Sequence, residues 1–104
     1  MPRFDVYANP SVRERKTTPF LLDVQNDYID GLATRVVIPL RTEAYFGTRA
    51  DRLNPLVHVA DEAVVLDTAA MGAVPLNLLK RPLTNLRVEQ GNITTALDTL
   101  FGAF

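Results

Sequence analysis

The sequence predicts a mainly β domain of the α+β class, in which a twisted antiparallel sheet is closed by a C-terminal helix. Over the first two thirds of the chain, apolar residues recur at every second position, as they do in strands with one buried face. After Leu86 the apolar spacing changes to that of a helix. The chain has 104 residues, enough for one modest core, so we expect a single domain over residues 1–104.

The strands are expected at about residues 4–7, 20–25 and 35–40, followed by a hairpin of residues 56–60 and 63–66 that turns at Asp61-Glu62. In the first strand, Phe4 and Val6 should face the core while Asp5 and Tyr7 face water. Asn9-Pro10 should end this strand, and the charged segment 11–18 is typical of a solvated loop. Pro39 lacks an amide hydrogen and therefore needs a sheet edge or a bend. One helical turn is expected near residues 42–46.

The C-terminal helix is predicted by a stripe of apolar residues, namely Ile93, Ala96, Leu97, Leu100, Phe101 and Phe104. Thr84 or Asn85 is expected to cap its start, and Gly102 can end it in the left-handed conformation. Phe101 should complete the core. Phe104 lies beyond the glycine stop and either joins the stripe or faces a partner.

Composition excludes several classes of function. Eleven basic and twelve acidic residues give a net charge of -1, which argues against a general nucleic-acid binder. The absence of cysteine excludes disulfides, thiolate zinc sites and thiol nucleophiles. No apolar stretch has the length of a signal peptide or a membrane span, so we expect a soluble cytoplasmic protein without a membrane partner.

The residues that could carry catalysis are few. His58 is the only histidine, and we expect a partly buried, hydrogen-bonded side chain. Asp23, Asp27 and Asp30 form the densest acidic group, but their spacing matches no ion-binding loop, so we expect solvated carboxylates. No glycine-rich phosphate loop or nucleophile motif is present. We therefore predict no catalytic residues, no metal site and no cofactor.

Several segments follow one another in a recognisable order and span essentially the whole chain. They are Phe4-x-Val6-Tyr7, residues 22–30 with Asp-Val-Gln-x-Asp-x-Ile-Asp, residues 35–40 with Val-Ile-Pro-Leu, residues 53–59, Met71-x-Ala73-Val74-Pro75 and the helix from Ile93 to Asp98. In this order the segments resemble the CcdB family of toxins from bacterial toxin–antitoxin pairs.

The resemblance implies an SH3-like, strongly bent antiparallel sheet with a smaller sheet and a long C-terminal helix. It also implies a homodimer that binds the A subunit of DNA gyrase, traps that enzyme on cleaved DNA and has no catalytic site of its own. A CcdA-like antitoxin would wrap its disordered segment on the toxin. DNA would be contacted only indirectly, through gyrase or the antitoxin complex.

Family positions that contact gyrase fall here on Asn26, His58, Thr95, Asp98, Gly102, Ala103 and Phe104. The best-known members end in Trp-Gly-Ile, where this chain has Gly102-Ala103-Phe104. For the antitoxin we expect contact at Arg13, Arg15 and Lys16, because a run of cations attracts an acidic peptide. For the dimer interface we expect Met71, Ala73 and Val74, which lie in an apolar segment of a small domain.

Two alternatives stay open. MazF-family toxins share this fold type but cleave RNA with an arginine and a serine or threonine, and Arg13, Arg35 and Thr34 are the residues that such a reaction would recruit. The second alternative is an inactive relative that only binds an antitoxin or represses its own operon.

Overall fold

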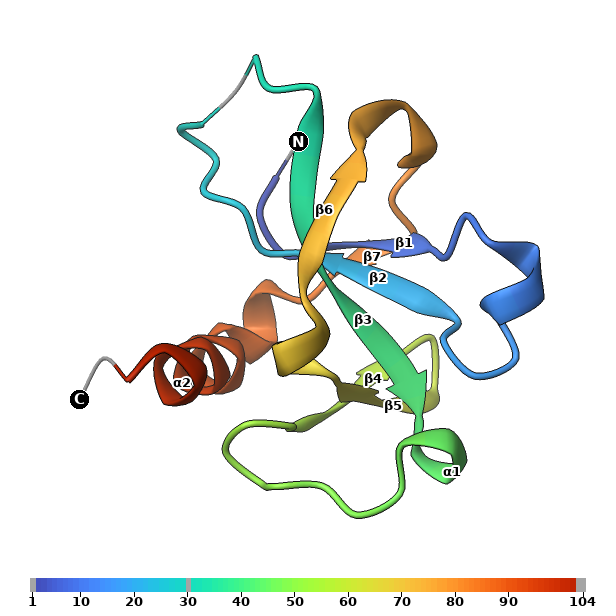
Figure 1. Ribbon diagram of the computed structural model, residues 1–104, viewed down its shortest axis with the longest axis vertical. Coiled ribbons are helices and arrows are strands. Elements are labelled where there is room, and N and C mark those ends of the chain that lie inside the picture. The colour runs from blue at the N-terminus through green and yellow to red at the C-terminus, as the bar shows by residue number, and fades with distance from the viewer. Residues whose placement is uncertain (1, 30, 103–104) are drawn as a thin grey trace.

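The computed structural model describes residues 2–29 and 31–102 and confirms the expected mainly β class (Figure 1). A bent antiparallel sheet forms a nearly closed barrel, and one longer helix lies beside it. The strands are β1 (Asp5–Ala8), β2 (Phe20–Asp23), β3 (Thr34–Thr42), β4 (Leu56–Val59), β5 (Glu62–Leu66), β6 (Gly72–Pro75) and β7 (Thr84–Asn85). The helices are α1 (Glu43–Phe46) and α2 (Gln90–Phe101), with short 3-10 turns η1 (Val12–Glu14), η2 (Thr68–Ala70), η3 (Leu76–Leu78) and η4 (Arg87–Glu89).

The long strand β3 organises the sheet, whose order is β4-β5-β3-β2-β1-β7. The first half of β3 pairs with β6, and its second half pairs with β5. The branch formed by β6 and the first half of β3 belongs to this same seven-stranded sheet. Pro39 lies in the gap between the two pairings, where its carbonyl oxygen accepts a hydrogen bond from the Asp67 amide at 3.0 Å. The missing amide hydrogen of the proline therefore falls in this gap, where it interrupts neither of the two pairings.

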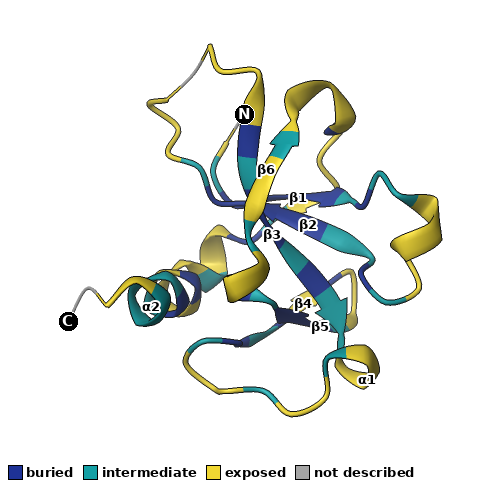
Figure 2. Ribbon diagram, in the orientation of Figure 1, coloured by how far each residue is buried: buried dark blue, intermediate teal, exposed yellow. Residues whose placement is uncertain are grey.

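The core inside the barrel is made of the alternate residues of the strands. In register across three strands, Val6, Leu22 and Ile38 point inward and are fully buried. The helix α2 covers one side of this core with Ile93 and Ala96. Figure 2 shows the central strands buried along most of their length, while β6 and the loops are largely exposed.

The outer face of β1 and β2 is buried as well, which corrects the expectation that Asp5 and Tyr7 face water. Tyr7 is only 2% exposed, and Asp5 is also buried. Leu79, from the connection between β6 and β7, packs on this face together with Tyr7 and Leu21. Alternation alone predicted a wet face because the segment that covers it comes from far along the chain.

Asp23 is the second correction, since its carboxylate is fully buried and not solvated. Arg35, on the neighbouring strand, donates from Nε to Asp23 Oδ2 at 2.8 Å and from Nη2 to Oδ1 at 2.9 Å. A buried carboxylate is tolerated only when it is paired in this way. Asp27 remains on the surface as expected, and Asp30 lies outside the described residues.

The predicted hairpin is present, with its turn one residue earlier than expected. Ala60 and Asp61 both adopt positive φ, at 49° and 68°, and connect β4 to β5. A two-residue hairpin turn in which both residues have positive φ has a backbone twist that fits the right-handed twist of the strands it connects. The turn near residues 42–46 is also confirmed as α1, in which the Thr42 hydroxyl accepts from the Tyr45 amide.

The helix differs from its prediction at both ends. Thr84 and Asn85 form β7 and do not cap the helix, since η4 intervenes and α2 begins at Gln90. Gly102 ends the helix in the left-handed conformation, with φ 70° and ψ 40°, as predicted. Phe101, expected in the core, is 68% exposed.

The exposure of Phe101 follows from helix geometry. An α-helix advances about 100° per residue, which places Phe101 some 80° away from the buried Ile93, at the margin of the apolar stripe. The last turn of α2 also projects away from the sheet (Figure 1). Within the described residues, no helix has the length and apolar character needed to cross a membrane.

Candidate functional site

The C-terminal half of α2 brings three of the expected gyrase-contacting residues together. Thr95, Asp98 and Gly102 follow a spacing of three and four residues, which places them on one face of a helix. That face points away from Ile93 and Ala96, the residues that α2 buries in the core. Thr95 and Asp98 are half-buried, Gly102 is exposed, and the exposed Phe101 ring lies beside them. Ala103 and Phe104 lie outside the described residues.

Asn26 lies in the loop that follows β2. Its side-chain oxygen accepts a hydrogen bond from the Tyr28 amide at 2.9 Å, which forms a local turn. The turn exposes Tyr28 almost completely, at 94%, and leaves Ile29 about half exposed. An aromatic and an aliphatic side chain are therefore presented to solvent next to Asn26.

His58 is on β4 and its side chain is exposed, which corrects the expectation of a partly buried imidazole. The alternation of β4 explains the difference, because Val57 and Val59 take the buried face and His58 takes the outer one. In Figure 1 the end of α2 and the loop with Asn26 lie on the same side of the molecule, whereas β4 lies below the centre of the sheet. The helix residues thus form one patch, with Asn26 and His58 on separate elements.

The expected antitoxin residues Arg13, Arg15 and Lys16 are all exposed on or next to η1. This segment lies on the opposite side of the molecule from the end of α2 (Figure 1). Arg15 differs from the other two because its Nε donates to the Asn9 carbonyl oxygen at 2.6 Å. That bond holds the guanidinium against a surface hollow that Arg13 and Lys16 do not line.

The expected dimer residues lie on or next to β6, but they do not share one face. Met71 packs against the barrel core, whereas Val74 packs on the outer cluster with Tyr7 and Leu21. Ala73 is exposed. Among residues 2–29 and 31–102, β6 pairs with β3 alone, so its second edge offers backbone groups to another chain.

Buried ionisable groups lie on the outer face of the sheet. Burial, together with the nearby carboxylates of Asp5 and Asp23, raises the pKa of Tyr7 to about 12. Burial also raises the pKa of Asp23, against the lowering effect of the Arg35 guanidinium. In the described part of the chain, no group of three or more histidine, aspartate or glutamate side chains is placed to hold a metal ion.

The residues that an RNA-cleaving toxin would recruit are not gathered at one site. Arg35 is buried and engaged with Asp23, so its guanidinium supports the fold. Thr34 precedes it on the same strand and is exposed, on the opposite face. Arg13 lies on η1, well away from the start of β3 in Figure 1.

Comparison with known families decides the kind of protein. The model of the CcdB family, described as CcdB protein, matches residues 3–102 of the chain. The chain belongs to the CcdB family. Membership in the CcdB family indicates a toxin of a toxin–antitoxin system, with an antitoxin as its partner. The bent sheet and the C-terminal helix described above are therefore those of a CcdB-type toxin.

Sequence reasoning missed two features of this CcdB-type surface. Lys80 and Arg81 line the same hollow as Arg15, although 65 residues separate Lys80 from Arg15 along the chain. The only sign of this cationic hollow in the sequence was that Lys80 and Arg81 are consecutive residues between two turn-forming segments. The exposed Tyr28 was the second feature, and an aromatic residue in a polar loop could have revealed it.

Proposed function

We propose that this CcdB-family protein is a toxin that binds the A subunit of DNA gyrase and poisons the enzyme without a catalytic step of its own. The match of the family over residues 3–102 carries the proposal. The end of α2 supports it, because Phe101 is exposed there beside Thr95 and Asp98. Binding hot spots are enriched in large side chains, aromatic ones among them, that become buried in the interface.

We propose that the contact surface consists of Thr95, Asp98 and Gly102 on α2 together with Ala103 and Phe104. Asn26, on the same side of the molecule, would extend this surface, and His58 would lie at its margin. The half-buried state of Thr95 and Asp98 supports this, since partly buried polar groups lose less entropy when they bind.

We further propose that the active form is a homodimer joined through β6 and the end of α2. The unpaired edge of β6 and the exposed Ala73 support this arrangement. A two-fold axis near the end of α2 would present the same contact surface twice, which suits a symmetric target. The antitoxin would neutralise this dimer through an acidic segment that contacts the side of the molecule on which η1 lies, with Arg15 as the contacting cation among the three expected from the sequence.

The test uses purified protein and purified gyrase in a supercoiling assay, with a parallel incubation on single-stranded RNA. We expect inhibited supercoiling and accumulation of cleaved DNA, with the RNA intact. RNA cleavage without an effect on gyrase would replace the proposal with an endoribonuclease. No effect in either arm would indicate a relative that only binds an antitoxin.

A further inference from the structure

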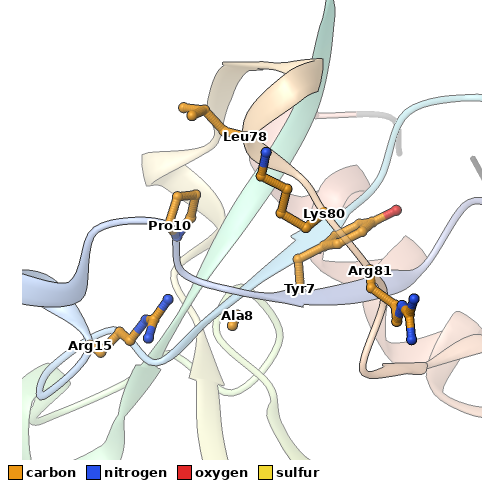
Figure 3. Close-up of a pocket in the computed structure, with 7 residues that line it drawn as sticks. All are labelled: Tyr7, Ala8, Pro10, Arg15, Leu78, Lys80 and Arg81. Atoms are coloured by element: carbon orange, nitrogen blue, oxygen red, sulfur yellow. The ribbon is translucent and has the colours of Figure 1, made fainter.

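A groove runs across the outer face of the molecule, between the β1–β2 loop and the connection from β6 to β7. Its first part is a hollow of about 400 Å³ lined by Tyr7, Ala8, Pro10, Arg15, Leu78, Lys80 and Arg81 (Figure 3). A second hollow of about 290 Å³ is lined by Pro10 and Leu78 as well. Because the two hollows share these residues, they lie next to each other, and we call the pair the Pro10–Leu78 groove.

The first hollow is strongly cationic. Figure 3 shows Arg15 approaching from the β1–β2 loop, and Lys80 and Arg81 from the segment before β7, with Ala8 and Tyr7 between them. No carboxylate lines this hollow. Within residues 2–29 and 31–102, none of these three cations forms an ion pair. Three cations around one hollow without a counter-charge favour an anionic occupant.

The second hollow has a different character. Its apolar lining includes Leu21, Pro39 and Val74. Its cation, Arg41, is already engaged, since it donates to Asp67 at 2.8 Å and to the Thr18 hydroxyl at 2.7 Å. Glu14 also lines this hollow and disfavours a second anion there. The groove therefore selects negative charge at one end and an apolar side chain at the other.

We infer that the Pro10–Leu78 groove binds an extended peptide segment, with carboxylate side chains among Arg15, Lys80 and Arg81 and an apolar side chain on Val74 and Leu21. A compact anion would fill only the first hollow. An extended chain, which advances about 3.3 Å per residue, reaches both. The inference rests on the proposed function only for the source of the segment, which would be the antitoxin. It assigns the recognition of acidic side chains to Arg15, Lys80 and Arg81, with Arg13 and Lys16 outside the groove.

The test measures the binding of a short fluorescein-labelled peptide, with leucines in its first half and glutamates in its second, by fluorescence anisotropy. Two matched pairs of charge reversals separate the groove from the general field of the protein. Arg15→Glu is compared with Arg13→Glu on the same loop, and Arg81→Glu with Arg52→Glu on the α1–β4 connection. Thermal melts check that each variant is folded. Arg15→Glu also removes the hydrogen bond from Arg15 to the Asn9 carbonyl oxygen and could disturb the loop. Arg81→Glu changes the charge of the groove without removing that bond.

We expect Arg15→Glu and Arg81→Glu each to weaken peptide binding at least about fivefold, because reversal replaces an attraction by a repulsion. The reversals at Arg13 and Arg52 should change it less than about twofold. Affinity should also fall as salt rises. Equal losses at groove and control positions would overturn the inference. So would equal binding of a peptide with lysines in place of the glutamates.

The same variants distinguish this inference from the proposed function. Arg81→Glu should inhibit gyrase as strongly as the unmodified protein, since Arg81 lies outside the proposed contact surface. The unmodified protein could fail to inhibit gyrase while the groove variants still lose peptide affinity. In that case the proposed target is wrong and the inference about the groove is retained. If gyrase is inhibited but the groove variants bind the peptide as tightly as the unmodified protein does, only the inference about the groove is wrong.

Discussion

Phe101 was expected to stabilise the core, but its position in the structure supports a role in binding. The apolar stripe predicted a buried ring, whereas the structure exposes 68% of it. We therefore expect Phe101→Ala to change the free energy of unfolding by less than about 1 kcal/mol at low protein concentration, as surface substitutions do. Ile93→Ala, in the same helix but fully buried, should cost about 2–5 kcal/mol.

Chemical denaturation of both variants measures this difference, and gyrase inhibition gives the functional readout. Phe101→Ala should weaken inhibition while it stays folded, because the exposed ring borders the proposed contact surface. A loss of stability as large as that of Ile93→Ala would show that the ring is buried in solution, in the monomer or in the dimer.

Tyr7 gives a prediction for alkaline pH. Its pKa is about 12 in the folded protein, against 10.0 for the exposed side chain. Between these values the folded protein keeps the proton and the unfolded chain loses it, so ionisation favours unfolding. The free energy of unfolding should therefore fall as pH rises from about 10 to about 12, by about 2 kcal/mol from this group.

Urea denaturation across that range measures the fall, with Tyr7→Phe as the reference for the other groups that titrate there. The phenylalanine variant should show a distinctly shallower pH dependence. Parallel pH profiles for the two proteins would show that the Tyr7 hydroxyl reaches water in the folded state.

Among the elements, β6 carries the proposed dimer interface, and it gives the most direct test of assembly. Ala73 is exposed on this edge strand, where an inserted charge would have to be buried on pairing with a second copy. We expect Ala73→Lys to weaken dimerisation at least about tenfold. Ala50→Lys, at an exposed position on the α1–β4 connection, is the matched control.

Light scattering over a micromolar concentration series decides between the outcomes. A dimer that both variants preserve would show that β6 lies outside the interface. A monomer for the unmodified protein would contradict the homodimer itself.

At the same scale, local patterns predicted most elements and failed where distant segments meet. The strand β3, the turn α1, the hairpin and the helix stop at Gly102 follow from alternation, capping and glycine chemistry, which are local. The burial of Asp23 and Tyr7 depends on Arg35 and Leu79, which come from other strands and connections. A local sequence pattern cannot predict which distant segment will pack over a strand and bury its side chains. The groove cations Lys80 and Arg81 escaped prediction for the same reason.

At the scale of the whole molecule, the candidate surfaces lie on different sides. The end of α2 projects on one side of the molecule, and the β1–β2 loop with η1 lies on the other (Figure 1). Pro10 and Arg15 of this loop line the Pro10–Leu78 groove. The resemblance located most positions of the first surface in the sequence. The second surface could be found only from the fold, because it joins residues 7–15 to residues 78–81, which lie far apart along the chain. A toxin with two such surfaces can present separate sites to its target and to its antitoxin.

The central claim is that the end of α2 binds the A subunit of gyrase, and isothermal titration calorimetry of the purified protein into that subunit tests it most directly. Asp98→Arg changes the proposed contact surface, and Asp51→Arg makes the same charge change at a carboxylate whose side chain is 90% exposed elsewhere. We predict saturable binding for the unmodified protein and for Asp51→Arg, and a loss of at least about tenfold for Asp98→Arg. Equal affinities for all three proteins, or no binding by the unmodified one, would contradict the account.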